Sequence, residues 1–141
     1  MFCGTSCYDQ RMIKGKFKYV IKRTGHGLGF IAEEKIPKGK RIIEYTGPVI
    51  SNDKVNERNR GKYFFGLNSK WSIDGSPRSN IARYVNHSCH PNAEAIQSGK
   101  RIWIWSMKTI QAGEEVTYDY GEEYFDEHIR PKGCGCRKCK R

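Results

Sequence analysis

One segment, residues 82–92, constrains this chain more than any other. It reads Ala-Arg-Tyr-Val-Asn-His-Ser-Cys-His-Pro-Asn, which gathers amide, imidazole, hydroxyl and thiol groups in a few positions before a proline turn signal. A plain loop has no need for such dense polar and sulfur chemistry. We therefore interpret the segment as a packed functional loop. We expect Asn80 and Arg83, at its approach, to have hydrogen-bonding roles.

Short apolar runs bounded by turn residues predict a series of short strands around this segment. The predicted strands cover residues 17–22, 41–45, 63–67, 71–74, 93–97 and 101–107, with hairpin tips at residues 68–70 and 98–100. Short helices are predicted at residues 51–60, where Ser51 is a candidate cap, and at residues 122–129.

Three glycines at alternate positions follow the first predicted strand: Gly25, Gly27 and Gly29. A backbone without Cβ atoms can turn tightly and approach a ligand closely. The spacing does not match a dinucleotide-binding fingerprint, and no long helical pattern follows. A ligand-facing backbone and a simple hairpin turn are the two interpretations.

Two other stretches show patterns that bear on packing. The pattern Ile-x-x-Gly-x-x-(Ile/Val) occurs at residues 36–42 and again at 110–116, which predicts two similar turn-then-strand corners. In the last predicted hairpin strand, Ile102 and Ile104 share one face while Trp103 and Trp105 share the other. We expect this strand to be buried on both faces. An aromatic platform for a ligand or nucleic acid is the alternative.

Length and charge limit the classes of protein to consider. The 141 residues suit one domain, and the net charge of +11 favours an acidic partner such as nucleic acid, or is simply a basic surface. The first residues form no apolar signal region, and no run reaches the ~20 apolar residues of a membrane span. We expect an intracellular protein without a membrane contact, in the cytoplasm or in a nucleus, including that of a host. Thiols stay reduced there, so the six cysteines predict a metal site.

Five short motifs follow one another along the chain. They are Gly27-x-Gly29, Glu44-Tyr45-x-Gly47, Asn86-His87-Ser88-Cys89, Glu114-Glu115-x-Thr117-Tyr118-Asp119-Tyr120 and Cys134-x-Cys136-x-x-Cys139. In this order they resemble the SET domain protein-lysine methyltransferases, and in particular the compact members of bacteria and viruses with a post-SET cysteine cluster. The resemblance spans about residues 16 to 140.

The resemblance implies a mostly β fold. SET domains consist of several small, mostly antiparallel sheets with few short helices, and the segment of the central motif threads beneath another loop as a pseudoknot. We accordingly divide the chain into an N-terminal segment (residues 1–15), a SET domain (16–125) and a post-SET zinc-binding tail (126–141). We expect the protein to be a monomer.

The resemblance also implies an activity, the methylation of lysine in a basic protein with S-adenosylmethionine as donor. Such substrates include histones and other nucleic-acid-associated proteins, and the cofactor leaves as S-adenosylhomocysteine. By motif position Tyr120 supplies the central hydroxyl, as a base or as an orienting group, and Tyr45 lines the lysine channel. Tyr118 stands where the family has Phe or Tyr. Its hydroxyl leaves less room for a methylated amine, so we predict mono- or dimethylation.

Cofactor and metal ligands follow from the same motifs. The expected cofactor-binding residues are Gly27, Leu28, Gly29, Tyr63, Arg83, Tyr84, Asn86, His87 and Tyr120. Asn86 and His87 are expected to act mainly through main-chain groups, and the alternative for His87 is a core histidine satisfied by its neighbours. Three thiolates in a short loop suit Zn²⁺, which prefers four tetrahedral ligands. The family supplies the fourth from the central motif, so the expected ligands are Cys89, Cys134, Cys136 and Cys139.

Charge is unevenly distributed near the C-terminus. Residues 112–127 contain seven acidic residues and no Lys or Arg, whereas residues 130–141 contain six basic ones. This predicts either two solvated faces or an acidic groove for a Lys/Arg-rich peptide with basic ends that contact nucleic acid. The rival functions are a catalytically silent SET-like module that binds protein or nucleic acid, and a zinc-dependent nucleic-acid-binding domain.

Overall fold

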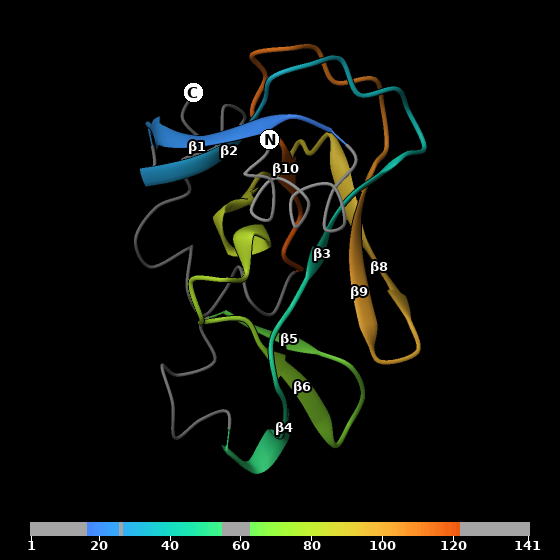
Figure 1. Cartoon of the computed structure of the whole chain (residues 1–141). Coiled ribbons are helices and arrows are strands. Elements are labelled where there is room, and N and C mark those ends of the chain that lie inside the picture. Colours follow the sequence, from blue (N-terminus) through green and yellow to red (C-terminus); the bar gives the residue numbers. More distant parts are fainter. Residues whose placement is uncertain (1–16, 26, 55–62, 122–141) are drawn as a thin grey trace, which may run out of the picture.

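Figure 1 shows the computed structural model of the chain, in which residues 17–25, 27–54 and 63–121 are described. Its strands are β1 (Tyr19–Thr24), β2 (Gly27–Ala32), β3 (Arg41–Tyr45), β4 (Val49–Ser51), β5 (Phe64–Gly66), β6 (Trp71–Asp74), β7 (Asn86–His87), β8 (Ala93–Ser98), β9 (Arg101–Ser106) and β10 (Thr117–Tyr118). Two 3₁₀ helices, η1 (Asn52–Lys54) and η3 (Ile81–Tyr84), complete the elements of the described residues. The predicted mostly β fold of several small sheets is confirmed.

Strands β1 and β2 form a two-stranded antiparallel sheet, at the top of Figure 1. The first strand begins and ends two residues later than predicted, at Tyr19 and Thr24. Thr24 pairs with Gly27, so Gly27 and Gly29 belong to β2 and not to the turn itself. The glycine stretch thus forms a hairpin, as one interpretation had it, and the ligand-facing interpretation stays a prediction.

The largest sheet has the strand order β3-β9-β8-β10-β7. Strands β3, β9 and β8 are antiparallel, and the β8–β9 hairpin predicted around residues 98–100 is confirmed. Strand β10 instead runs parallel to both β7 and β8, placing Tyr118 beside His87 and Ala93. The last strand of the sheet thus lies between two strands on either side of residues 88–92. The pseudoknot crossing itself stays a prediction.

The third sheet has the order β4-β6-β5 and lies at the bottom of Figure 1. Its β5–β6 hairpin confirms the prediction around residues 68–70. Strand β4 ends at Ser51, whose hydroxyl accepts from the backbone N–H of Asp53 at 3.3 Å, so the cap role predicted for Ser51 is confirmed. Of the predicted helix, only η1 falls within the described residues. Most of the helix predicted at 51–60 and all of that predicted at 122–129 lie outside them.

The two similar corners at residues 36–42 and 110–116 pair with each other. Ile36 and Ile110 exchange two backbone hydrogen bonds, each 2.8 Å from N to O. Gly39 and Gly113 have φ angles of 79° and 92°, values that suit glycine. The corners run side by side at the top of Figure 1. The predicted corners are confirmed, and their pairing brings residues 114–116 against β2.

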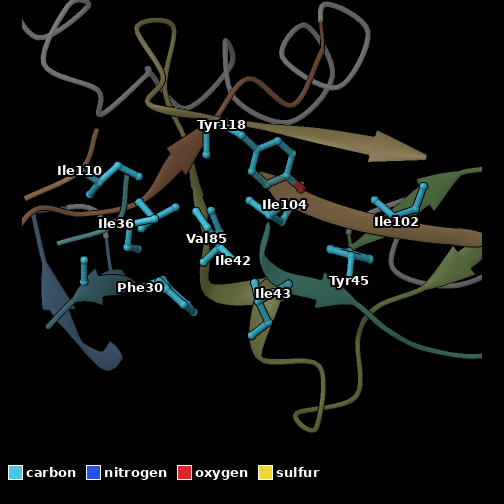
Figure 2. Packing of buried hydrophobic residues seen from close by; sticks show 14 of the residues in the cluster. Phe30, Ile36, Ile42, Ile43, Tyr45, Val85, Ile102, Ile104, Ile110 and Tyr118 are labelled. Atoms are coloured by element: carbon cyan, nitrogen blue, oxygen red, sulfur yellow. The ribbon is translucent and has the colours of Figure 1, made fainter. Parts of the chain in front are cut away.

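A single apolar cluster underlies the sheets, and Figure 2 shows its packing. Its largest fully buried apolar side chains are Phe30, Ile36, Ile42, Ile43, Val85, Ile102, Ile104, Ile110 and Val116. Burying a side chain of this size stabilises the fold by roughly 1.5–3 kcal/mol. Val85 comes from the central segment and Tyr118 from β10, so core packing holds both in place.

The two faces of β9 differ, which corrects the expectation that both are buried. Ile102 and Ile104 are fully buried, whereas Trp103 and Trp105 are only half-buried. The guanidinium of Arg41 lies 4.3 Å from the centre of the Trp103 ring, and that of Arg101 lies 5.1 Å from it. Cation–π stacking with long arginine stems therefore covers part of these rings.

Among the described residues, no helix has the length and apolarity needed to cross a bilayer.

Candidate active site

The central segment reaches its place through a buried amide. Asn80 is 1% exposed; its Nδ2 donates to the carbonyl of Gly75 and its Oδ1 accepts from the backbone N–H of Thr46, each at 3.0 Å. These bonds join the start of η3 to the chain after β6 and to the end of β3. The hydrogen-bonding role predicted for Asn80 is confirmed.

Two of the predicted catalytic tyrosines have their hydroxyl protons committed. The hydroxyl of Tyr120 donates to the carbonyl of Val85 at 2.5 Å, and that of Tyr45 donates to the carbonyl of Tyr63 at 2.6 Å. A carbonyl oxygen can only accept, so the direction of both bonds is set. Each phenolic oxygen therefore faces any further partner as an acceptor.

Successive ring contacts connect these tyrosines. Ring centroids are 5.4 Å apart for Tyr45 and Phe65, 6.5 Å for Phe65 and Tyr118, and 4.8 Å for Tyr118 and Tyr120. We call these four residues the tyrosine row. The structure thus brings all three predicted catalytic residues together, and it adds Phe65, which the sequence reasoning missed. Alternation in the strand predicted at residues 63–67 would have placed Phe65 on the same face as Tyr63.

Tyr45 is held by unusual backbone on its far side. Tyr63 has a φ of 66°, a left-handed conformation that is uncommon outside glycine. Its carbonyl accepts both the Tyr45 hydroxyl and the backbone N–H of Gly75, the latter at 2.8 Å. A Cβ atom at Gly75 would collide with the Tyr45 ring and hydroxyl. Local strain and a missing side chain thus position one phenolic oxygen, a combination often found at functional sites.

A second group of predicted residues lies where β2 meets β7. The side-chain nitrogen of Asn86 donates to the carbonyl of Leu28 at 2.9 Å and to the carboxylate of Glu115 at 2.7 Å. Gly27 and Leu28 are exposed beside this junction, while Gly29 is buried. We call Gly27, Leu28, Gly29, Asn86 and Glu115 the β2–β7 wall. Four of them were predicted to bind the cofactor; Glu115 was not.

Arg83 stacks on two aromatic rings, and its backbone N–H donates to the carbonyl of Asn80 at 3.1 Å. Its guanidinium lies 4.3 Å from the ring centre of Tyr63 and 5.4 Å from that of Tyr84. Its Nε is buried and has no hydrogen-bond partner within the described residues. Buried donors nearly always have partners, so this N–H suits an anionic ligand group.

The side chain of His87 is buried and satisfied by its neighbours, while the cofactor contact expected mainly through its main-chain groups stays a prediction. Its Nδ1 accepts from the backbone N–H of Tyr120 at 3.1 Å, and its Nε2 lies 3.3 Å from the Cys89 sulfur. Because a backbone N–H can only donate, the neutral ring carries its proton on Nε2 and donates towards that sulfur. Burial lowers the pKa of His87, and the Asp119 carboxylate, 3.8 Å from Nδ1, opposes this.

Only one of the four predicted metal ligands can be placed. Cys89 is partly buried, and its sulfur faces the His87 ring. Cys134, Cys136 and Cys139 lie outside the described residues. Within residues 17–25, 27–54 and 63–121 no group of three or more His, Cys, Asp or Glu side chains could hold a metal ion. The zinc site therefore stays a prediction.

Comparison with known proteins places this geometry in a family. Residues 27–121 match the model of the SET domain. Histone-lysine N-methyltransferase Set2 of Drosophila melanogaster is 36% identical over 86% of this chain and 6% of its own length. Human histone-lysine N-methyltransferase 2D is 38% identical over 99% of this chain and 3% of its own length. Histone-lysine N-methyltransferase ASHH3 of Arabidopsis thaliana is 36% identical over 96% of this chain and 41% of its own length. This chain belongs to the SET domain family.

Proposed function

We propose that this chain transfers a methyl group from S-adenosylmethionine to the side-chain amine of a lysine in a basic protein. The observation that carries the proposal is the tyrosine row, whose two end hydroxyls both donate to main-chain carbonyls. The names of the relatives, all histone-lysine N-methyltransferases, support the reaction class. The chain spans 6% and 3% of the length of the first two relatives, so the activity of those whole proteins is for this chain a proposal.

The residues at the β2–β7 wall suit such a cofactor. The exposed backbone of Gly27 has open space around it, and the buried Nε of Arg83 suits the carboxylate of an amino-acid moiety. Asn86, His87, Tyr63, Tyr84 and Tyr120 would complete the binding set. When bound, S-adenosylmethionine supplies a methyl group on a sulfonium cation and leaves as the neutral thioether S-adenosylhomocysteine.

The tyrosine row would prepare the lysine amine. Free lysine has a pKa of about 10.4, yet only the neutral amine is nucleophilic. The rings of Phe65 and Tyr118 exclude water, and desolvation disfavours the ammonium form. The oxygens of Tyr45 and Tyr120 would accept the two N–H bonds of the neutral amine and so aim its single lone pair at the methyl carbon. Their own protons are committed to carbonyls, so both tyrosines orient the amine, and its lost proton goes to water.

The number of methyl groups added to the lysine would depend on Tyr118. Its ring is 6% exposed and lies against Tyr120 and Phe65. A hydroxyl on this ring takes up space that a methylated amine would need. We therefore propose mono- or dimethylation, and Tyr118→Phe should shift the products towards trimethyllysine in a mass-spectrometric assay. An unchanged distribution would rule this role out.

A structural zinc ion is proposed at the C-terminal tail. Cys89 would ligate it with Cys134, Cys136 and Cys139, in residues 126–141, and Zn²⁺ bound to four thiolates is a stable tetrahedral site. Donation from His87 Nε2 to the Cys89 sulfur suits a thiolate ligand. Metal analysis of the purified protein should give one zinc per chain, lost in Cys89→Ser.

The substrate proposed is a Lys/Arg-rich segment of a histone or another nucleic-acid-associated protein. The acidic residues 112–127 would form its groove, and basic residues 130–141 would contact nucleic acid. Reversing Glu122 and Glu123 to Lys should raise KM for a basic peptide. The protein would act as a monomer in a nucleus or the cytoplasm, with residues 16–125 as its catalytic unit.

The deciding experiment incubates the protein with methyl-labelled S-adenosylmethionine, a panel of histones and a cell lysate. Tyr120→Phe, which removes one hydroxyl, should lower label on lysine by about 10²-fold through lost orientation. Tyr19→Phe is the matched control. Tyr19 lies in β1 and stacks on Phe30 of β2, and neither strand contributes a residue to the row. Absence of both label and cofactor binding would instead favour the catalytically silent binding module, and salt-sensitive nucleic-acid binding without cofactor binding would favour the zinc-dependent domain.

A further inference from the structure

The two glycines of β2 are required for different reasons. Gly27 has a φ of 95°, and an added Cβ atom would meet nothing within 4 Å. Gly29 has no such φ, yet an added Cβ atom would lie 2.6 Å from Glu115 Oε2 and 2.7 Å from Thr24 Cγ2. Backbone conformation therefore explains Gly27, whereas occupied space explains Gly29. The space over Gly29 is filled by atoms of this chain.

The carboxylate that fills this space also holds Asn86. Its Oε2 accepts from the amide of Asn86 at 2.7 Å, and the same amide donates to the carbonyl of Leu28 at 2.9 Å. Both amino protons of Asn86 are thereby committed, which sets the orientation of its amide. The backbone of Glu115 is itself anchored, since it bridges to Ile31 and its carbonyl accepts from Asn92 Nδ2 at 2.9 Å.

We propose that Glu115 is a positioning residue of the cofactor site and that its carboxylate is the reason position 29 must be glycine. The carboxylate is wedged between β2 and β7, so it sets the distance between the two strands that present the cofactor-binding backbone. The inference rests on the proposed function, because it assigns Glu115 to that same site.

The test is a double-mutant cycle between positions 29 and 115. It is made in a Thr24→Ser background, because Ser keeps the hydroxyl that donates to the Gly27 carbonyl at 2.8 Å but removes the second obstructing methyl. Gly29→Ala is combined with Glu115→Ala, which removes the obstruction, and with Glu115→Gln, which keeps its size. Urea unfolding of the free protein and calorimetric titration with S-adenosylmethionine are measured for each.

Gly29→Ala should weaken cofactor affinity about tenfold when position 115 keeps its full-length side chain, as expected for directly contacting residues. In the Glu115→Ala background the same substitution should change affinity by less than about twofold, because the truncated side chain no longer clashes with the added methyl. The two positions would then be energetically coupled. The Glu115→Gln background should behave like the parent. Glu114→Ala is the matched control: Glu114 is exposed and accepts from the Gln111 N–H at 2.6 Å, so its loss should leave the effect of Gly29→Ala unchanged.

The outcomes separate this proposal from the proposed function. Additive effects of Gly29→Ala and Glu115→Ala on affinity would overturn the positioning role, even if the unfolding free energies were coupled. A parent protein that binds neither S-adenosylmethionine nor S-adenosylhomocysteine would refute the proposed function, and the cofactor role of Glu115 with it. Coupled unfolding free energies would in that case show that Glu115 and Gly29 are in contact for structural reasons alone.

Discussion

The tyrosine row and the β2–β7 wall hold their functional groups in different ways. In the row, ring packing places the side chains, and each end hydroxyl adds one bond to a main-chain carbonyl. In the wall, the polar groups of Asn86 and Glu115 are themselves the links between strands. A hydroxyl can therefore be removed from the row while its packing stays. In the β2–β7 wall, a substitution that removes a polar group also removes a link between strands.

The largest expected effect comes from Gly75→Ala, which would displace Tyr45, one of the residues of the tyrosine row. The added methyl would collide with the Tyr45 ring, which is 4% exposed and cannot move away freely. Overpacking of this kind should lower the unfolding free energy by about 1–3 kcal/mol. Misplacement of the Tyr45 oxygen should lower kcat by about 10²-fold. Urea unfolding and initial rates measure the two effects.

Gly66→Ala provides the control for that prediction. Gly66 lies in β5, which pairs with β6, the strand that ends directly before Gly75, and an added Cβ atom at Gly66 would meet nothing within 4 Å. It should leave kcat unchanged and alter the unfolding free energy by less than about 1 kcal/mol. Equal losses in both variants would mean that the row does not depend on the fit between Gly75 and Tyr45.

Arg83→Lys tests the region between the row and the wall. Lysine keeps the charge but loses the planar stacking on Tyr63 and the Nε–H. Loss of one charge-assisted hydrogen bond should weaken cofactor affinity about tenfold, with kcat at saturating cofactor little changed. Arg101→Lys is the control, because Arg101 pairs with Glu44 on an exposed sheet face. A loss of kcat without a loss of affinity would move Arg83 from the cofactor side to the row.

Tyr45→Phe sharpens the comparison from the side of the row. The ring contact with Phe65 stays, whereas the phenolic oxygen is lost, and with it the bond to the Tyr63 carbonyl and the proposed bond from the lysine amine. We expect kcat to fall about tenfold, the equivalent of roughly 1.4 kcal/mol for one hydrogen bond, with KM for the cofactor unchanged. A higher KM with normal kcat, seen in steady-state kinetics, would contradict an orienting role.

The smallest expected effect is a pH dependence at His87, where the row meets the central segment. Burial lowers the pKa of His87 in the folded protein, so below the ordinary value of about 6.5 the unfolded chain binds the proton more readily. The unfolding free energy should therefore fall as the pH drops from about 6.5 towards the lowered value, and stay level above 6.5. NMR titration of the imidazole gives the folded pKa directly. A midpoint at or above 6.5 would contradict the prediction.

Much of the candidate site could be predicted from sequence because it lies in short, ordered motifs. Tyr45, Tyr118 and Tyr120 stand at defined positions in those motifs, and the structure brings them into one row. Phe65 has no motif of its own and became visible only through its ring contacts. Glu115 lies inside one of the five motifs. No sequence pattern links it to Gly29, which lies 86 positions earlier in the chain.

Sequence alone determined the local elements of this protein: the hairpins at residues 68–70 and 98–100, the two glycine corners, and the order of the motifs. Turn residues and apolar alternation act over a few positions, so these features can be read from the chain itself. Only the tertiary structure decided that the corners pair, that β10 lies between β7 and β8, and that arginines cover the tryptophan face of β9. Those outcomes depend on which segments distant in sequence pack together. The hydrophobic effect favours burial of an apolar face, but it is non-directional and does not select the segment that covers the face.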